Sequence, residues 1–403
     1  MLKSVVIKDF FSFKGEVEIS LNRGVNVLLG INGSGKTSFI NVLRLLSEGV
    51  TGKGIGQLLQ TEWGGYSQIL NCTGREKSND VQITYIFDSE IINNFNASAG
   101  FHSNVYYKIT IHPLGDTDYF LDEKLWTEHN TEEGKEFVYL DFHNGQGKLS
   151  KRADGSISFQ SYAGDDVSGR ELVLKQITDP MQYLPIYTIK KAIESISVYN
   201  SFDTGEYSKI RRLSEYSFGE RLWRNGENLT QILNELKNNH SLDFEKIEEE
   251  LHKVNPNYKN IEINNIAGQA CLLLRERNLN KTIKALHISD GTLCFLLLEA
   301  IFLNPGKGCF VAIDEPERGL HPDMIRSVAD MIKSATKNTQ FIIATHSPNL
   351  LNQFELEDVL VFEKDESNAT CVKRLSDGDY SDYDGPLLPG QLWLNGEIGG
   401  KRW

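Results

Sequence analysis

Close to its N-terminus the chain reads Gly30-Ile31-Asn32-Gly33-Ser34-Gly35-Lys36-Thr37, which fits the phosphate-binding pattern G-x-x-x-x-G-K-[ST] at every fixed position. An apolar run at 25–29 precedes this stretch, as a buried strand would, and apolar residues at helical spacing follow it over 36–46. Glycines let such a loop turn so that backbone N–H groups and the first turn of the helix face an anion. The stretch therefore predicts a loop that binds the phosphates of a nucleoside triphosphate.

The side chains of this loop have distinct predicted roles. Lys36 would reach the β- and γ-phosphate oxygens, and the Thr37 hydroxyl would ligate Mg²⁺. Six further residues would surround the phosphates: Gly30, Asn32, Gly33, Ser34, Gly35 and Ser38. Because the flanking strand and helix patterns are both present, a chance glycine-rich loop is the weaker interpretation.

A second apolar run, at 309–313, ends in two adjacent acids, Asp314 and Glu315. This is the pattern of a buried parallel strand with carboxylates at its C-terminal edge. Asp314 suits Mg²⁺ coordination, and Glu315 suits polarising a water molecule for in-line attack on the γ-phosphate. Acids also cap strand ends for purely structural reasons, but the phosphate-binding loop earlier in the chain favours the catalytic interpretation.

Two further places offer polar groups to the same nucleotide. The apolar run 341–344 leads to His346, which would contact the γ-phosphate if this strand lies one position beyond the carboxylate strand. Ser289 and Gly291 stand where an apolar helix over 293–302 would begin, and a helix start offers N–H groups to an anion. By itself Ser289 would be an ordinary N-cap.

The rest of the chain predicts an α/β protein with an insertion. Strands over 4–10, 17–21 and 25–29 would form a β-meander that leads into the loop, and the glycine-rich stretch 51–74 is predicted to be a loop with little regular structure. We expect four parts in chain order: the first part of a nucleotide-binding head (1–90), an insertion that is strand-rich and then helical (91–260), the second part of the head (261–365) and a tail (366–403).

Composition excludes several classes of protein. The 403 residues carry a formal net charge of −13 at pH 7, which argues against a polycation that coats nucleic acid. Local basic pairs, each more often a solvated surface pair, are Lys190-Lys191, Arg211-Arg212, Arg221 with Arg224, and Lys281 with Lys284. The five cysteines are widely spaced and form no C-x-x-C pair, which argues against both a zinc module and a disulfide framework. No run approaches the ~20 apolar residues of a membrane span, so we expect a cytoplasmic protein.

The order of these motifs resembles the ABC-type ATPase heads of the SMC, Rad50 and RecF branch. The Phe10–Phe13 opening, the string Asp314-Glu315-Pro316-Glu317-Arg318-Gly319-Leu320-His321-Pro322 and Thr345-His346-Ser347-Pro348 are most similar to prokaryotic ATPases of the AAA15/AAA21 group, which is akin to the ATPase half of OLD proteins. The resemblance implies an α/β ABC-type P-loop head with a mixed sheet, which binds ATP and Mg²⁺. It also implies catalytic roles for Lys36, Glu315 and His346, and a head-to-tail homodimer in which Ser289 and Gly291 complete the partner's site.

The chain departs from the common pattern at three positions. Its signature turn, Ser289 to Thr292, carries Asp290 and Thr292 where the common L-S-G-G-Q has glycine and glutamine, as the AAA15/AAA21 group does, and His321 stands where many relatives carry aspartate. The Q-loop glutamine stays open among Gln57, Gln60 and Gln68. About forty residues follow Val361, too few for the Toprim nuclease of OLD proteins. The tail residues predicted to pack on the head are Trp393, Gly399, Gly400 and Trp403.

Two functions fit this resemblance. The first is a nucleotide-gated regulatory ATPase, which would control a separate effector protein in anti-phage defence. The alternative is a RecF-like DNA-repair ATPase that binds DNA structures, and the acidic net charge disfavours it. A transporter ATPase is a weaker interpretation because of the large insertion and the divergent signature, and a small-molecule kinase would leave His346 and the signature without a purpose.

Overall fold

The computed structural model describes residues 1–72, 80–128, 136–153, 156–163, 166–177, 179–380 and 388–399. A six-stranded sheet carries the phosphate-binding loop, and five of its strands are parallel. In spatial order its strands are β10 (Ile196–Tyr199), β15 (Phe310–Asp314), β16 (Gln340–Thr345), β3 (Val25–Leu29), β17 (Val359–Lys364) and the antiparallel edge strand β18 (Thr370–Arg374). Every residue of β3 and β16 is buried, which explains why both strands are mostly apolar on both faces.

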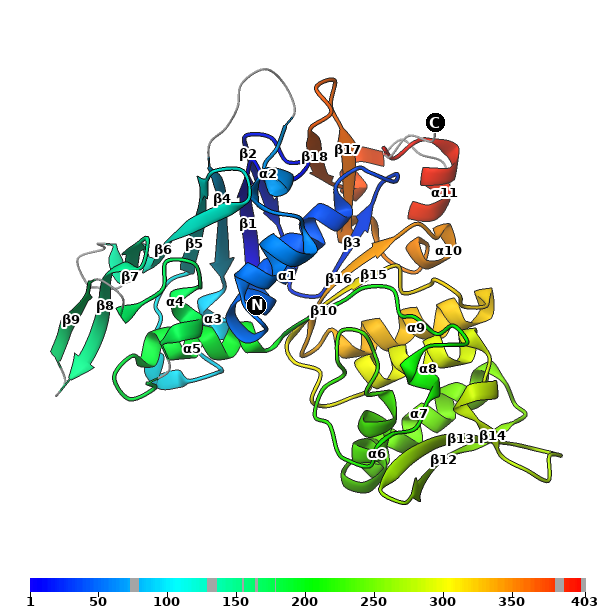
Figure 1. Ribbon diagram of the computed structural model, residues 1–403. Helices are drawn as coiled ribbons and strands as arrows, with labels where there is room; N and C mark the ends of the chain where they lie inside the picture. Colours follow the sequence, from blue (N-terminus) through cyan, green and yellow to red (C-terminus); the bar gives the residue numbers. More distant parts are fainter. Residues whose placement is uncertain are drawn as a thin grey trace.

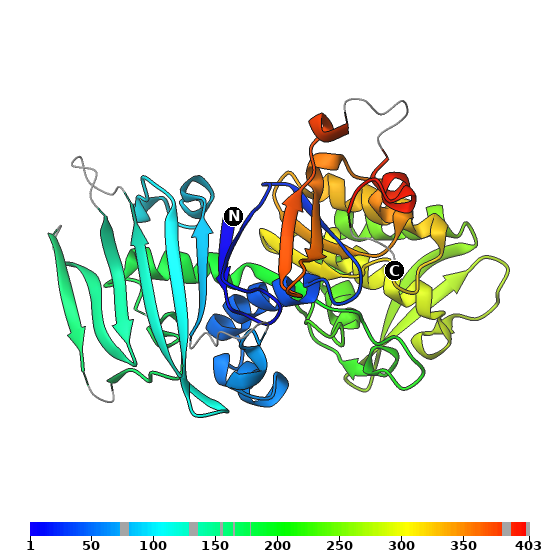
Figure 2. The ribbon, with the colours of Figure 1, turned by 90° about the horizontal axis from the view of Figure 1, so that it is seen from above.

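An eight-stranded antiparallel sheet extends from one side of this core (Figures 1 and 2). In spatial order its strands are β2 (Glu16–Ser20), β1 (Leu2–Lys8), β4 (Val81–Phe87), β5 (Val105–Leu114), β6 (Asp118–Thr127), β7 (Phe137–His143), β8 (Gln146–Ala153) and β9 (Ser156–Tyr162). Buried and partly exposed residues alternate along β4 and β6, so one face packs on the core and the other is open. Helices α4 (Val173–Gln176) and α5 (Leu184–Glu194) contribute to the packed side.

Helix α1 (Lys36–Thr51) lies between the two sheets (Figure 1). Its apolar side chains share one cluster with the antiparallel sheet and with one face of the parallel sheet, through residues such as Leu28 and Ala312. The opposite face of the parallel sheet, including Val27 and Ile313, packs on helices α8 (Asp290–Phe302) and α9 (Pro322–Ala335). The parallel strands are therefore covered on both faces, and the helix that follows the phosphate-binding loop is held from two sides.

A smaller sheet and two helices form the part of the chain between β10 and α8. Its strands are β11 (Ser214–Glu215), β13 (Gln269–Glu276), β12 (Tyr258–Ile266) and β14 (Ile283–Lys284). The helices are α6 (Leu229–Asn239) and α7 (Ser241–Val254), and they contact β13, β12 and α8 (Figure 1). The remaining α-helices are the short α2 (Tyr66–Ile69), α3 (Ser89–Ile92), α10 (Pro348–Leu351) and α11 (Pro389–Asn395).

The expected α/β head is confirmed, but two local expectations were wrong. Strand β3 does not continue a meander with β1 and β2, and instead pairs in parallel with β16 and β17, because a strand that is apolar at four of five positions needs cover on both faces. The stretch 51–74 contains a π-helix, η1 (Gln57–Glu62), and α2. Strand β10 also falls inside the predicted insertion 91–260, yet it pairs with β15 in the central sheet. The division into four parts stays a prediction.

The tail packs on the head through α11, where Leu392 and Trp393 are buried next to α10. Gly399 is partly buried, whereas Gly400 and Trp403 lie outside the described residues. Among the described residues, the structure contains no helix with the length and apolar character needed to cross a membrane.

Candidate functional site

The phosphate-binding loop joins β3 to α1 and depends on its glycines. Gly33 and Gly35 have φ angles of 79° and 113°, in the region that favours glycine. A Cβ atom at Gly35 would lie 2.4 Å from Thr370 Oγ1, so the position has no room for a side chain. The Thr370 hydroxyl donates to the Ser34 carbonyl over 2.8 Å, and its oxygen lies 2.8 Å from the Ser12 hydroxyl oxygen. Strand β18 therefore braces the loop, which sequence reasoning did not predict.

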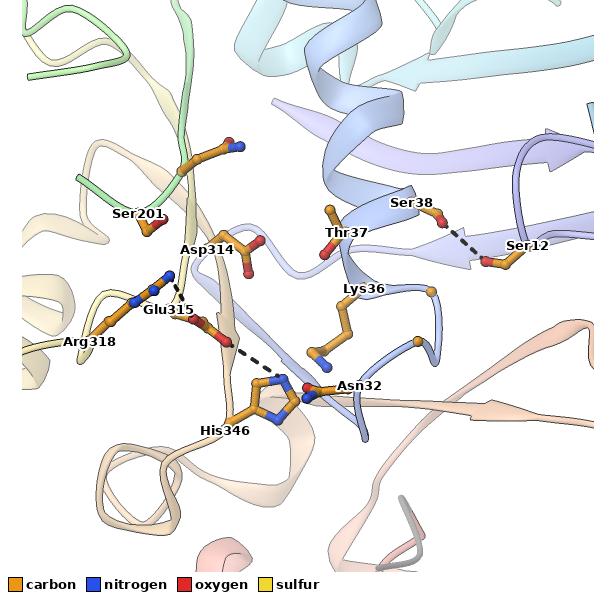
Figure 3. A pocket seen from close by; sticks show the side chains of 13 residues that line it. Ser12, Asn32, Lys36, Thr37, Ser38, Ser201, Asp314, Glu315, Arg318 and His346 are labelled. Carbon is orange, nitrogen blue, oxygen red and sulfur yellow. Dashed lines mark hydrogen bonds and ion pairs between the residues drawn. The ribbon is translucent and has the colours of Figure 1, made fainter. Parts of the chain in front are cut away.

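A cavity of about 390 Å³ opens beside this loop, and the predicted strand ends converge on it (Figure 3). Its lining residues are Ser12, Asn32, Gly33, Gly35, Lys36, Thr37, Ser38, Asn200, Ser201, Asp314, Glu315, Arg318 and His346. Of the predicted phosphate-loop residues, Gly30 and Ser34 lie behind the lining. Gly30 contributes a carbonyl that accepts a hydrogen bond from Lys36, and Ser34 is fully buried.

Lys36 is held beneath the loop by backbone carbonyls. Its Nζ donates to the carbonyl oxygens of Gly30 at 2.7 Å and Ile31 at 3.1 Å. Burial lowers the pKa of Lys36 to about 8, against the opposing effect of Asp314 and Glu315. The ammonium group of Lys36 therefore lies buried at the start of α1. No side chain caps this helix, because Gly35 stands at its N-cap position, so the first N–H groups of α1 are left for an anion in the cavity.

Asp314 lies across the cavity from Thr37, as Figure 3 shows. Burial and neighbouring Glu315 raise the pKa of Asp314, whereas Lys36 and a hydrogen bond with the Thr37 side chain oppose that rise. A hydroxyl and a carboxylate that face one another are oxygen ligands of the kind that Mg²⁺ prefers. The donor set therefore fits the predicted metal ligands, Thr37 and Asp314.

Glu315 adopts a backbone conformation that is rare for a side-chain-bearing residue, with φ at 50°. Its N–H donates to the Ala344 carbonyl over 2.9 Å, which ties the turn after β15 to the end of β16. Its carboxylate lies 3.8 Å from His346 Nε2 and 3.9 Å from an Arg318 guanidinium nitrogen (Figure 3). Non-glycine residues at positive φ persist where the surrounding structure holds them, often at functional sites.

His346 owes its position to a residue that sequence reasoning missed. Glu317 accepts hydrogen bonds from Thr345 Oγ1 at 2.5 Å and from the His346 N–H at 3.0 Å. Burial and the Lys36 ammonium lower the pKa of His346, against the opposing effect of Glu315, so its imidazole is neutral at neutral pH. Glu317 is the second residue after the Asp-Glu pair, and the only sequence signal for its role was its place in that motif string.

Asn200 is a second residue that sequence reasoning missed. It follows β10, which lies beside the carboxylate strand β15, and it lines the cavity. Its Oδ1 atom is shielded from solvent and accepts no hydrogen bond from the described residues.

The predicted Q-loop candidates Gln57, Gln60 and Gln68 lie in η1 and α2, and the cavity lining within the described chain includes none of them. The sequence signal for Asn200 was the short stretch Ile196–Tyr199, apolar or aromatic at three of its four positions, directly before a polar pair.

We therefore expect Asn200→Ala to slow ATP hydrolysis by roughly tenfold to a hundredfold, the cost typical of losing a group that orients metal ligands or water. Nucleotide affinity and thermal stability should change little, because the amide oxygen has no protein partner to lose. Phosphate release and nucleotide titration measure the two effects separately. Asn239→Ala, at an exposed position of α6, is the matched control. Unchanged hydrolysis in the Asn200 variant would contradict a role in the site.

The signature turn lies outside the cavity that its own chain forms. Ser289 caps α8, and its Oγ accepts a hydrogen bond from the Thr292 N–H over 3.2 Å. Neither Ser289 nor Gly291 lines the cavity, although Asp290 lines a smaller neighbouring pocket that shares Asp314 and Glu315 with it. The structure of one chain thus brings the predicted phosphate-loop, carboxylate and histidine groups together, and leaves the signature turn apart from them.

Arginines of the predicted basic pairs serve the structure. Arg211 donates to the carbonyls of Ala285 and Ile288 and pairs with the carboxylate of Asp290, so it supports the signature turn. Arg221 donates to the Glu194 carbonyl, and Arg224 pairs with Glu48 at 3.1 Å. Because these guanidinium groups are bound within the chain, they do not form the local basic groove that would favour DNA binding.

A comparison with family models gives the family. The model described as "AAA domain, putative AbiEii toxin, Type IV TA system", AAA_21, matches residues 25–352 of the 403. The chain belongs to the AAA_21 family. The match begins at β3 and extends past His346, so it includes every motif of the site.

One curated protein and two solved structures are similar to this AAA_21 chain. The chain is 25% identical over 157 residues to the "Retron Ec83 probable ATPase" of Escherichia coli. This alignment covers 35% of the present chain and 28% of that protein, so the chain spans well under half the length of that relative. Two solved structures share the fold. One is an Smc head bound to the C-winged helix domain of ScpA, with a TM-score of 0.57 and 14% identity over 93% of this chain and 98% of that chain. The other is an Smc head from Pyrococcus furiosus bound to the C-terminal domain of ScpA, with a TM-score of 0.55 and 13% identity over 94% of this chain and 98% of that chain.

Proposed function

We propose that this AAA_21 chain binds and hydrolyses ATP as a homodimeric switch that regulates a separate effector protein in anti-phage defence. The observation that carries the proposal is the split between the two halves of the site. Lys36, Asp314 and Glu315 meet in one cavity, whereas Ser289 of the same chain lies outside it. A second copy, placed head to tail, would supply the missing turn to the first.

Each residue has a proposed task in hydrolysis. Backbone N–H groups of the loop and the Lys36 ammonium hold the phosphates. Thr37 and Asp314 would hold Mg²⁺, which when bound neutralises charge that develops on the phosphate oxygens. Glu315 takes a proton from the attacking water, and the neutral His346 donates a hydrogen bond to the γ-phosphate. Glu317 keeps the His346 backbone in place, and so acts through it.

Mixing two inactive variants tests the shared site. Lys36→Ala and Ser289→Arg should each abolish hydrolysis alone, because each damages both sites of a homodimer. After mixing, activity should recover to about a quarter of the wild-type value, since half of the dimers are mixed and each has one intact site. Phosphate release from equimolar mixtures measures the recovery. No recovery, with both variants folded, would show that the site is not shared between copies.

The regulatory role needs a separate test. Similarity to part of a retron ATPase supports a defence function. Co-expression with the neighbouring gene should give a complex whose toxic or nuclease activity changes with ATP, and cells carrying both genes should resist phage. Growth arrest by this chain alone would contradict a purely regulatory role and favour the toxin role named in the family description. The RecF-like alternative has less support because the arginines at 211, 221 and 224 are bound within the chain.

A further inference from the structure

Three potential metal ligands meet on the open face of the antiparallel sheet, outside the nucleotide cavity. His143 on β7 lies directly opposite Asp122 on β6, and His112 on β5 lies opposite Phe120, two residues from Asp122. The neighbours of Asp122 along β6 are buried on the packed side, so its own side chain lies on the other face with the two histidines. The strand register itself brings these residues together.

The three ligand-bearing side chains lie close enough together to share one cation. His112 Nε2 lies 2.9 Å from one oxygen of Asp122, and His143 Nδ1 lies 2.7 Å from the other. All three ligand atoms lie within 4.8 Å of one another. Asp122 Oδ1 is shielded from solvent, yet it accepts no hydrogen bond of proper geometry among the described residues, despite the nearby imidazole. A carboxylate oxygen that is shielded from solvent and accepts no hydrogen bond would be stabilised by a bound cation.

Asp80 provides a second, independent observation. Its carboxylate lies 2.8 Å from His112 Nδ1, on the side of the ring away from Asp122. A carboxylate on one ring nitrogen of a metal-binding histidine fixes the tautomer and directs the other nitrogen at the metal. The Nε2 atom of His112 therefore lies on the Asp122 side of the ring, where a cation shared with that carboxylate would sit.

We propose that His112, Asp122 and His143 bind one zinc ion, with Asp80 as the supporting carboxylate. Two imidazoles and one carboxylate are ligands typical of Zn²⁺, whereas Mg²⁺ and Ca²⁺ prefer oxygen alone. Tetrahedral zinc needs its ligand atoms about 3.3 Å apart, from bond lengths near 2.0–2.1 Å. The 73% exposed side chain of His143 is free to make this adjustment.

The surroundings of the cluster indicate what the ion does. Phe120 stacks on the His112 ring at 4.7 Å and meets the His143 ring edge-on at 5.6 Å, which gives the cluster one apolar side. The ion would link three neighbouring strands of the sheet, and solvent at His143 would supply water as the fourth ligand. The proposed role of the ion is therefore structural: it would hold β5, β6 and β7 together and stabilise the antiparallel sheet.

Titration of the chelator-stripped, full-length chain with Zn²⁺ alone tests this site. Competition with a chromogenic chelator should give one tight site per chain, and zinc should raise the melting temperature. His143→Ala and Asp122→Asn should each weaken zinc binding by at least a hundredfold, and Asp80→Asn by roughly tenfold to a hundredfold. Asp141→Asn, an exposed carboxylate two residues before His143 on β7, and His240→Ala, an exposed histidine after α6, should bind zinc as the wild type does.

Cobalt substitution distinguishes this site from the cysteines. Co²⁺ bound by imidazole and carboxylate gives visible bands without a thiolate charge-transfer band, and the Cys72→Ser, Cys371→Ser double variant should keep that spectrum. A thiolate band in the wild type would overturn the proposal. So would equal zinc affinity in the wild type and in a His112→Ala, His143→Ala double variant, because the cluster would then be a metal-free set of ion pairs.

Discussion

Glu315→Gln should bind ATP with nearly wild-type affinity, hydrolyse it at least a hundredfold more slowly and accumulate as an ATP-bound dimer. A general base contributes about 10²- to 10⁴-fold to a rate, and glutamine keeps the shape of the side chain while it cannot accept the proton. The backbone at this position is held at a φ of 50° by a hydrogen bond to the end of β16, and that bond does not involve the side chain. The substitution therefore removes chemistry and leaves the geometry in place.

Phosphate release and size-exclusion chromatography with and without ATP measure the two effects of this variant. Glu366→Gln, an exposed glutamate in the turn between β17 and β18, is the matched control and should behave as the wild type. Hydrolysis by the Glu315 variant at close to the wild-type rate would show that another group acts as the base. A slow variant that stays monomeric with ATP would instead contradict the dimeric switch.

Lys36→Ala should weaken ATP binding by about a hundredfold, because a charged hydrogen bond to phosphate contributes up to about 3 kcal/mol. In the structure the ammonium is held by the carbonyls of Gly30 and Ile31, so it already lies under the loop. Its burial disfavours the charge, and alanine should therefore leave the fold stable. Titration calorimetry with ATP gives the affinity, and Lys53→Ala, at an exposed position just after α1, is the control. Wild-type affinity in the Lys36 variant would contradict the assignment.

The pKa of Lys36 predicts how ATP affinity depends on pH. Burial lowers the pKa of Lys36 to about 8, and contact with anionic phosphate would raise it. The contribution of Lys36 to binding is then complete below pH 8 and is lost as the pH rises through the higher pKa of the complex. ATP affinity should fall over that alkaline range in the wild type, and this fall should be absent in the Lys36→Ala variant.

The parts of the site that could be predicted from sequence are those whose chemistry is local. The loop from Gly30 to Thr37 lies between a strand and a helix that are its immediate neighbours in the chain, so a short pattern contains the whole unit. Asp314, Glu315 and His346 each follow a strand with an unbroken apolar run, and parallel strands place such ends at one edge of a sheet. The structure brings these residues into one cavity.

The residues that sequence reasoning missed depend on neighbours far away in the chain. Asn200 lines the cavity because the four-residue strand β10 pairs with β15, more than a hundred residues later. A buried run of four residues is too short to distinguish a strand from a helix, so this pairing could not be predicted. Glu317 has a role only because β16 places the His346 backbone beside it, and Thr370 has one only because β18 lies next to the phosphate loop.

The sequence by itself therefore determined the α/β class and the positions of the glycine-rich loop, the carboxylate pair and the strand-end histidine. Local spacing of apolar and polar residues is sufficient for each of these. Only the tertiary structure decided that β3 lies inside a parallel sheet, that Ser289 stands apart from the cavity, and that His112, Asp122 and His143 share one face of another sheet. These facts depend on strand register and on packing between distant segments, and a pattern within one segment contains no information about its partner.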